Sequence, residues 1–188
     1  MFSNSAEECQ KYIEHLRKHE GKLATAHLKN QPNWKKWIFE VGIRGGGSVN
    51  LNALHVAIIM RNIEVINDIL EQKDIKSFVD QTVKESDYIE HVDEQEDDDW
   101  IYGATVLHLA ARFFHDCLQK LIEMSSSLVN NQDNRMKYSP LHVTAISEFS
   151  VGSRILLLKG AKVDAQEKHG RTPLYFAAKS ENYHEIVT

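Results

Sequence analysis

The chain has 188 residues, a formal net charge of −5 and 42% hydrophobic residues, and this length suits one domain. The sequence contains no apolar run long enough to span a bilayer. Cys9 and Cys117 lie far apart in the sequence, which argues against a disulfide framework and favours a reducing, cytoplasmic setting. Residues 1–50 hold eight Lys or Arg and five Asp or Glu, whereas residues 51–188 hold fourteen and twenty-two, so the second part is a poor candidate for binding phosphate backbones.

Residues 1–49 are predicted to form a helical capping region. Ser5 and Glu8 have the spacing of a capping box, and an amphipathic helix is expected over residues 6–20. A second helix is expected over residues 22–29. A further helical stripe follows, formed by Trp34, Trp37, Ile38 and Val41.

Two pairs of residues in this region have alternative interpretations. Trp34 and Trp37 either pack against the segment that follows them, which we favour, or contact a partner, because Trp is enriched in binding hot spots. His15 and His19 lie four residues apart, a spacing that can bind a metal ion. No third ligand is evident near them, so two solvated histidines are predicted.

A block of six residues recurs four times after this region. Its copies begin at Asn52, Thr105, Ser139 and Thr172 and read NALHVA, TVLHLA, SPLHVT and TPLYFA. The last two intervals are 34 and 33 residues. A fixed period of this size indicates repeated units that stack on one another, so function is expected on the surface of the stack and not in a buried catalytic pocket.

The residue types of the block have physical reasons. Thr or Ser at its start can cap a helix, and Pro is tolerated in the first helical turn. Gly103 and Gly170 lie two residues before the cap, where a turn that needs positive φ is expected. Asn50 holds this place in the first unit and tolerates such a φ, whereas Lys137 in the third unit is predicted to be strained.

The block resembles the Thr-Pro-Leu-His-x-Ala signature of the ankyrin repeat. Residues 156–161 and 163–165 are similar to the end of that family's second helix and to its loop. The resemblance implies an all-α fold, an α-solenoid of ankyrin-type helix–turn–helix repeats with an N-terminal helical cap. It places an ankyrin-repeat domain at residues 50–188, with repeats that start near Asn50, Gly103, Lys137 and Gly170.

The histidines of the block, His55, His108 and His142, invite a metal or catalytic interpretation. The resemblance instead implies a structural motif, in which this His makes hydrogen bonds that tie the turn of one repeat to the next. Tyr175 holds this place in the last repeat, which a shared catalytic role would not allow. The other positions of the structural motif are Thr105, Ser139, Thr172 and Pro173.

The interval between the first two blocks is about 20 residues longer than the period, with the excess within residues 73–102. Its acidic run and the residue after it comprise Asp93, Glu94, Glu96, Asp97, Asp98, Asp99 and Trp100. The run is interpreted either as a solvated loop or as a partner-binding finger that attracts a basic surface. A calcium site is disfavoured because the glycine and the terminal Glu of an EF-hand loop are missing.

Two further features depart from the family pattern. Phe113 and Phe114 stand where a short Gly-containing turn is common, and they either pack inward or form an apolar patch for a partner. The third repeat also lacks the glycine at residues 148–150. The fourth repeat stops at Thr188 without the Leu-Leu portion of its second helix, which favours a fragment of a longer protein.

The sequence has no Gly-rich phosphate loop, nucleophile elbow or activated Cys/His pair, so we predict a non-catalytic protein–protein interaction module without cofactor or metal. A protein partner with a basic surface is expected, and neither nucleic acid nor membrane; the oligomeric state stays open. We favour a bacterial effector that acts on host proteins in the host cytosol. The alternatives are an IκB-like inhibitor of a transcription factor and the recruiting arm of a larger enzyme whose catalytic domain lies beyond Thr188.

Overall fold

The structure, a computed structural model, describes residues 3–31, 33–42, 48–85, 101–132 and 134–179. Its α-helices are α1 (Ser3–Arg17), α2 (Gly21–Lys29), α3 (Ala53–Ile59), α4 (Ile63–Leu70), α5 (Lys76–Val79), α6 (Val106–Phe113), α7 (Leu118–Met124), α8 (Pro140–Ile146), α9 (Ser150–Leu158) and α10 (Pro173–Lys179). Short 3-10 helices are η1 (Trp34–Lys36), η3 (His115–Cys117) and η4 (Ser126–Asn130). The strands β1 (Phe39–Gly42), β2 (Ser48–Leu51) and β3 (Lys84–Glu85) form an antiparallel sheet in the order β1-β2-β3.

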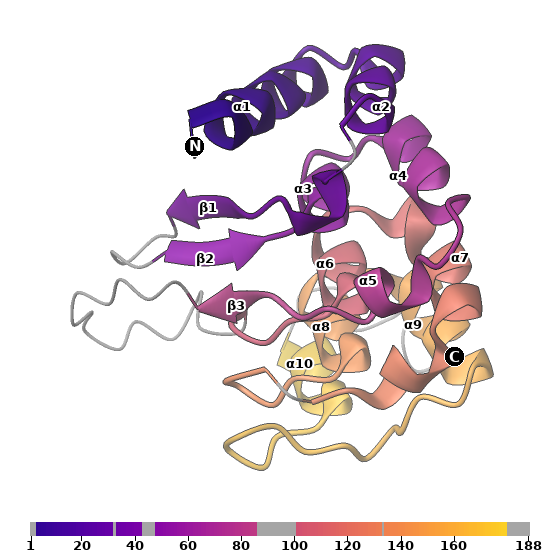
Figure 1. Cartoon of the computed structure of the whole chain (residues 1–188). Helices are drawn as coiled ribbons and strands as arrows, with labels where there is room; N and C mark the ends of the chain where they lie inside the picture. Colours follow the sequence, from indigo (N-terminus) through magenta and orange to yellow (C-terminus); the bar gives the residue numbers. More distant parts are fainter. Residues whose placement is uncertain (1–2, 32, 43–47, 86–100, 133, 180–188) are drawn as a thin grey trace.

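The helices stack in a column, which confirms the expected helical solenoid (Figure 1). The first helices of the repeats, α3, α6, α8 and α10, contact one another in sequence order. The second helices, α4, α7 and α9, form a second row on one side of them, and the strands and turn segments project on the other side (Figure 1). Within the described part of the chain, no helix combines the length and apolar character needed to cross a bilayer.

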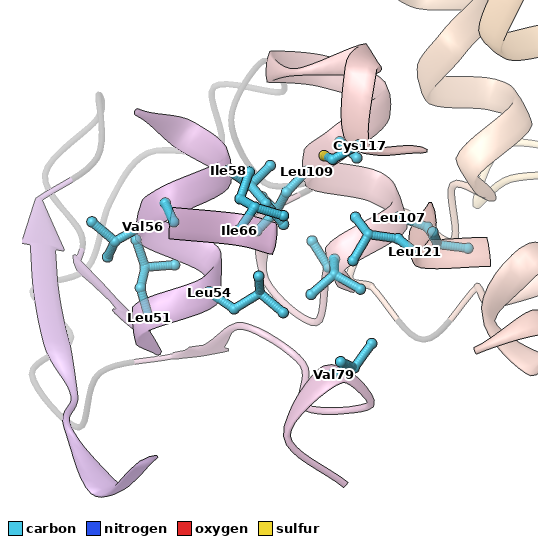
Figure 2. Packing of buried hydrophobic residues seen from close by; sticks show 14 of the residues in the cluster. Leu51, Leu54, Val56, Ile58, Ile66, Val79, Leu107, Leu109, Cys117 and Leu121 are labelled. Atoms are coloured by element: carbon cyan, nitrogen blue, oxygen red, sulfur yellow. The ribbon is translucent and has the colours of Figure 1, made fainter. Parts of the chain in front are cut away.

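The core lies between the two rows of helices, where leucines and isoleucines from neighbouring repeats interdigitate (Figure 2). Leu54 and Ile66 of the first repeat and Leu107 and Leu121 of the second are all fully buried. A single repeat has too little apolar surface to form a closed core by itself, so each one depends on its neighbours.

The predicted third helical stripe in the N-terminal region is wrong. Only Trp34–Lys36 is helical, as η1, and the chain then turns extended at Trp37 and enters β1. Burial alternates along this segment, because Ile38 is 66% exposed whereas Phe39 is 3% exposed and pairs with Leu51 of β2. Pairing with a strand ten residues further along the chain thus overrides the local helical period.

Aromatic packing joins the N-terminal region to the first repeat. Trp34 and Trp37 are both buried, as the packing interpretation predicts; Trp34 lies edge-on to Phe78, and Trp37 lies edge-on to Tyr12. The Tyr12 hydroxyl donates a hydrogen bond to the backbone oxygen of Ala53 at the start of α3 (3.0 Å). These contacts support the proposal that residues 1–49 cap the stack.

Of the two histidines predicted to be solvated, His19 is exposed as expected, whereas His15 is not fully solvated. His15 is half-buried, and its Nδ1 lies 2.9 Å from a carboxylate oxygen of Glu20. His19 lies just after the helix with a φ of 56°. The chain reverses between α1 and α2 at this point, and the reversal brings Glu20 back to His15.

The long interval after the first block is located by comparing the repeats. From Val79 to Thr105 there are 26 residues, whereas from Val129 to Ser139, the matching positions of the next repeat, there are 10. Two backbone hydrogen bonds hold the ends of this longer segment together, and we call them its closed base. The N–H of Val83 donates to the oxygen of Ala104 (2.8 Å), and the oxygen of Val83 accepts from the N–H of Gly103 (2.9 Å). Most of the extra residues therefore lie beyond a closed base, between Val83 and Gly103.

The turn positions before the blocks are partly as expected. Gly103 and Gly170 have φ values of 81° and 78°, and Lys137 has a φ of 54°, a left-handed conformation that costs a non-glycine residue energy. The expectation for Asn50 is wrong, because Asn50 lies in β2 and pairs with Glu40 and Lys84 in an extended conformation. The β1–β2 hairpin replaces a tight turn at the entrance to the first repeat.

Candidate interaction surface

The block histidines connect consecutive repeats through their two ring nitrogens. Nδ1 of His108 accepts a hydrogen bond from the N–H of Thr105 (3.1 Å), so Nε2 carries the proton and donates to the oxygen of Tyr138 (2.8 Å). His142 repeats this arrangement with the N–H of Ser139 (3.1 Å) and the oxygen of Arg171 (3.1 Å). Tyr138 and Arg171 directly precede the next block, so each ring joins its own helix to the start of the following repeat.

His55 makes the same kind of connection with a different partner. Its Nδ1 accepts from the N–H of Asn52 (3.3 Å), and its Nε2 donates to the oxygen of Gln81 (3.2 Å). The Asn52 side chain caps α3 by accepting from the N–H of His55 (2.9 Å) and also donates to the Gln81 side chain (3.0 Å). The first repeat is therefore bound to the segment that precedes the long insertion.

Burial favours the neutral form of the His55 and His142 imidazoles. It lowers the pKa of His55 to about 4, and it lowers the pKa of His142 as well. Both nitrogens of each ring are already used in hydrogen bonds, which leaves no lone pair for a metal ion or a substrate proton. Burial also raises the pKa of Cys117 to about 12, so this thiol is a poor nucleophile.

Hydrogen bonds join successive turn segments into a continuous surface, which we call the hairpin edge. It comprises residues 48–51, 83–85, 101–104, 134–138 and 165–171. The N–H of Arg135 donates to the oxygen of Tyr102 (2.8 Å), and the N–H of Lys168 donates to the oxygen of Met136 (3.0 Å). The Arg135 guanidinium also lies 4.2 Å from the centre of the Tyr102 ring. The hairpin edge and the first helices together form the candidate interaction surface.

A buried carboxylate stabilises the last turn of the hairpin edge. Burial alone would raise the pKa of Glu167, but hydrogen bonds from the Arg171 side chain and from the N–H groups of Arg171 and His169 outweigh it and lower that pKa. The Arg171 guanidinium lies 5.0 Å from the centre of the Phe176 ring in α10. The charge of Glu167 is thus used within the fold and is not available to a partner.

The predicted partner-binding residues fall into two groups. The acidic residues from Asp93 to Asp99, with Trp100, lie outside the described residues, and so their role stays a prediction. Phe113 and Phe114 are half-buried and pack against the core at the turn between α6 and α7, outside the hairpin edge. The next side chain, His115, stacks on Phe149 of the third repeat with ring centres 3.3 Å apart.

A groove of about 370 Å³ at the N-terminal end of the hairpin edge was not predicted from the sequence. The residues that line it include Lys35, Lys36 and Lys84 but no Asp or Glu. The positive balance of residues 1–50 was the available signal. It did not identify the groove, because Lys84 reaches it from a distant part of the chain. Among all the described residues, no group of three His, Cys, Asp or Glu side chains is placed to hold a metal ion.

Comparisons with known proteins agree with the repeat geometry. The model of the family of ankyrin repeats, in three copies, matches residues 107–188. The chain is also similar to the nuclear factor NF-kappa-B p105 subunit of Gallus gallus, with 28% identity over 133 residues, which covers 69% of this chain and 11% of that protein. Ankyrin repeats mediate protein–protein interactions. The family match, the recurring block and the histidine connections between repeats together show that residues 107–188 consist of ankyrin repeats.

Proposed function

We propose that the chain is an IκB-like inhibitor, a non-catalytic module that binds a transcription factor through its hairpin edge and first helices. The similarity to the NF-kappa-B p105 subunit carries this proposal. The charge of residues 51–188 supports it, since they hold eight more acidic than basic residues and DNA-binding proteins present basic surfaces. This excess comes from residues 86–100, which hold eight acids and no Lys or Arg, and these acids would compete with DNA for such a partner.

The two other settings have less support. A bacterial effector role is motivated by the irregular repeats and the long insertion, which are also compatible with an inhibitor. A role as the recruiting arm of a larger enzyme has no separate observation in its favour. The two cysteines are free, and Cys117 is buried, which suits the cytoplasmic location that we propose for the inhibitor.

The test uses a purified NF-kappa-B transcription factor bound to a fluorescent DNA duplex. The intact chain should displace the DNA with an apparent Kd below about 1 µM, as expected for a standard-size interface. Neutralising the acids at positions 93, 94, 96, 97, 98 and 99 to amides should weaken displacement about tenfold at low salt. A matched control neutralises six exposed acids elsewhere, Glu7, Glu14, Glu71, Asp74, Asp116 and Glu123, and should keep full displacement.

Two outcomes count against this proposal. An intact, folded chain that displaces no DNA at tens of micromolar would reject the inhibitor role. Equal losses in the acidic-run variant and in the control would assign the effect to net charge and remove the acidic run from the binding surface.

A further inference from the structure

The groove at the N-terminal end of the hairpin edge is formed by parts of the chain that are distant in sequence. Its lining includes Lys36, Trp37 and Ile38 from the segment before β1, Leu51 from β2, and Gln81 and Lys84 from the segment after α5. It exists only because the β1–β2 hairpin places the capping region beside the first repeat. It is thus part of neither region alone.

Strand alternation explains the chemistry of the groove. Phe39, Val49 and Leu51 are buried against the core, so alternate residues of the sheet face outward. Asn50 and Lys84 are register partners, and cross-strand partners share one face of a sheet. Ile38 is 66% exposed, although it is a large apolar residue beside the entrance to β1. The groove therefore combines an accessible apolar side chain with polar and basic groups.

The ammonium groups of the groove are largely uncommitted. Neither Lys36 nor Lys84 forms a side-chain hydrogen bond or ion pair with another described residue, and both are exposed. Lys35 donates one hydrogen bond to the backbone oxygen of Lys73 (3.1 Å) and retains its charge. The acid on the same face of the sheet, Glu40, pairs in register with Asn50 and accepts a hydrogen bond from the Ser48 hydroxyl (2.7 Å). The balance in and beside the groove is therefore positive in a chain whose net charge is negative.

We propose that this groove binds an acidic peptide segment of a partner protein. Carboxylates of the peptide contact Lys36 and Lys84, and an apolar side chain of the peptide covers Ile38. Charge complementarity selects an acidic segment, and the exposed isoleucine favours a peptide over a small inorganic anion, which would gain nothing from it. The groove overlaps the N-terminal end of the hairpin edge, but the proposal is tested separately from the inhibitor function, because the groove is basic whereas the acids proposed to compete with DNA lie within residues 86–100.

The probe is a fluorescein-labelled peptide of twelve residues in which Glu and Asp alternate with Leu and Val. Its control replaces every acid with the corresponding amide. By fluorescence anisotropy in about 50 mM salt, the acidic peptide should bind the full chain about tenfold more tightly than the amide peptide. Raising the salt to about 300 mM should reduce this preference to about threefold, since the ammonium groups are exposed.

Variants locate the binding on the groove. Lys36→Glu combined with Lys84→Glu should weaken acidic-peptide binding at least about tenfold, and Ile38→Ala should weaken it about threefold. The matched control, Lys22→Glu combined with Lys162→Glu, makes the same charge change at exposed lysines elsewhere and should bind as the parent does. Thermal melting of every variant checks that the fold is retained; exposed positions should shift Tm little.

Three outcomes would overturn the proposal. The first is equal binding of the acidic and amide peptides. The second is competition by inorganic polyphosphate that matches the peptide and does not change with Ile38→Ala, which would mean a simple anion surface. The third is a tenfold gain in peptide affinity when the acids at positions 93–99 are neutralised, which would assign the groove to the chain's own acidic run.

Discussion

The first junction between repeats differs from the next two in one bond and one insertion. His108 and His142 donate to the residue directly before the following block, whereas His55 donates to Gln81, which precedes the insertion. The base of the insertion is closed by the hydrogen bonds between Val83 and residues 103–104. His55 bonds to Gln81, which comes before Val83 in the chain. The residues inserted between Val83 and Gly103 therefore do not change the spacing of the helices, and the stack keeps its register.

The three junctions also differ in the lengths of their hydrogen bonds. The bonds that the His108 ring makes to the N–H of Thr105 and the oxygen of Tyr138 measure 3.1 and 2.8 Å, against 3.3 and 3.2 Å for the corresponding bonds of His55. The bond from His108 to Tyr138 is also buried, whereas the bond from His55 to Gln81 is part-buried, and loss of a bond costs more where water cannot replace it. This difference predicts that the regular junction is the stronger of the two.

The largest effect is expected from His108→Ala, which should lower the free energy of unfolding by about 4 kcal/mol. The change leaves a cavity, leaves the N–H of Thr105 without its partner, and removes one of the hydrogen bonds to the oxygen of Tyr138, which keeps the bond from Asn134. His55→Ala should cost about 2 kcal/mol. Chemical denaturation measures both, with His169→Ala, an exposed residue, as the control. Equal losses at His55 and His108 would show that the insertion does not weaken its junction.

Mild acid should destabilise the fold through the junction histidines. The folded-state pKa of His55, about 4, lies below its ordinary value of 6.5, so the unfolded chain binds the proton more readily between these values. The contribution of neutral His55 to the free energy of unfolding is therefore complete above pH 6.5 and is lost as the pH falls towards 4. The loss is at most about 3 kcal/mol. His142 acts in the same direction, since its pKa is also lowered.

The measurement is the free energy of unfolding at several pH values between 7 and 4. His55→Gln should reduce the slope of stability against pH, whereas His169→Gln should leave it unchanged, because that residue is exposed. An unchanged slope in His55→Gln would mean that other groups cause the acid sensitivity.

Replacing residues 86–100 with Asn-Gly tests whether the insertion is external to the stack. The replacement shortens the segment between Val83 and Gly103 from 19 residues to 6, which lowers the entropic cost of bringing its ends together, so stability should rise by about 1 kcal/mol. Far-UV circular dichroism should retain the helical signal, and unfolding should stay cooperative. A loss of stability would show that residues 86–100 contribute to the first junction, which would remove the contrast with the other two.

The smallest effects are expected at the turns before the third and fourth blocks. Lys137→Gly should stabilise the chain by about 0.5 to 1 kcal/mol, because glycine adopts a φ of 54° without strain. Gly170→Lys should destabilise it by a similar amount, and the cost comes from the backbone alone, since no atom lies within 4 Å of a Cβ built at Gly170. If both variants were stabilised, or both destabilised, the turns at residues 137 and 170 would not have equivalent geometry.

The repeat architecture could be predicted from the sequence because it depends on local patterns. The capping residues, the apolar spacing and the recurring block each act within one or two helical turns, and the block recurs at a near-constant interval. The positive φ at Gly103, Lys137 and Gly170 follows from the same register. The start of the first repeat was less predictable. Asn50 lies two residues before its block, as Gly103, Lys137 and Gly170 do before theirs, but it pairs in the sheet instead of forming a turn.

By itself, the sequence determined the stack, its register and the position of the insertion. Only the tertiary structure decided that the segment after Trp37 becomes a strand, that Gln81 receives the His55 bond, and that Lys36 and Lys84 line one groove. The physical reason is the range of the interactions. Capping and helix periodicity act between near neighbours, whereas strand pairing and groove formation join residues up to about fifty positions apart, whose proximity no local pattern contains.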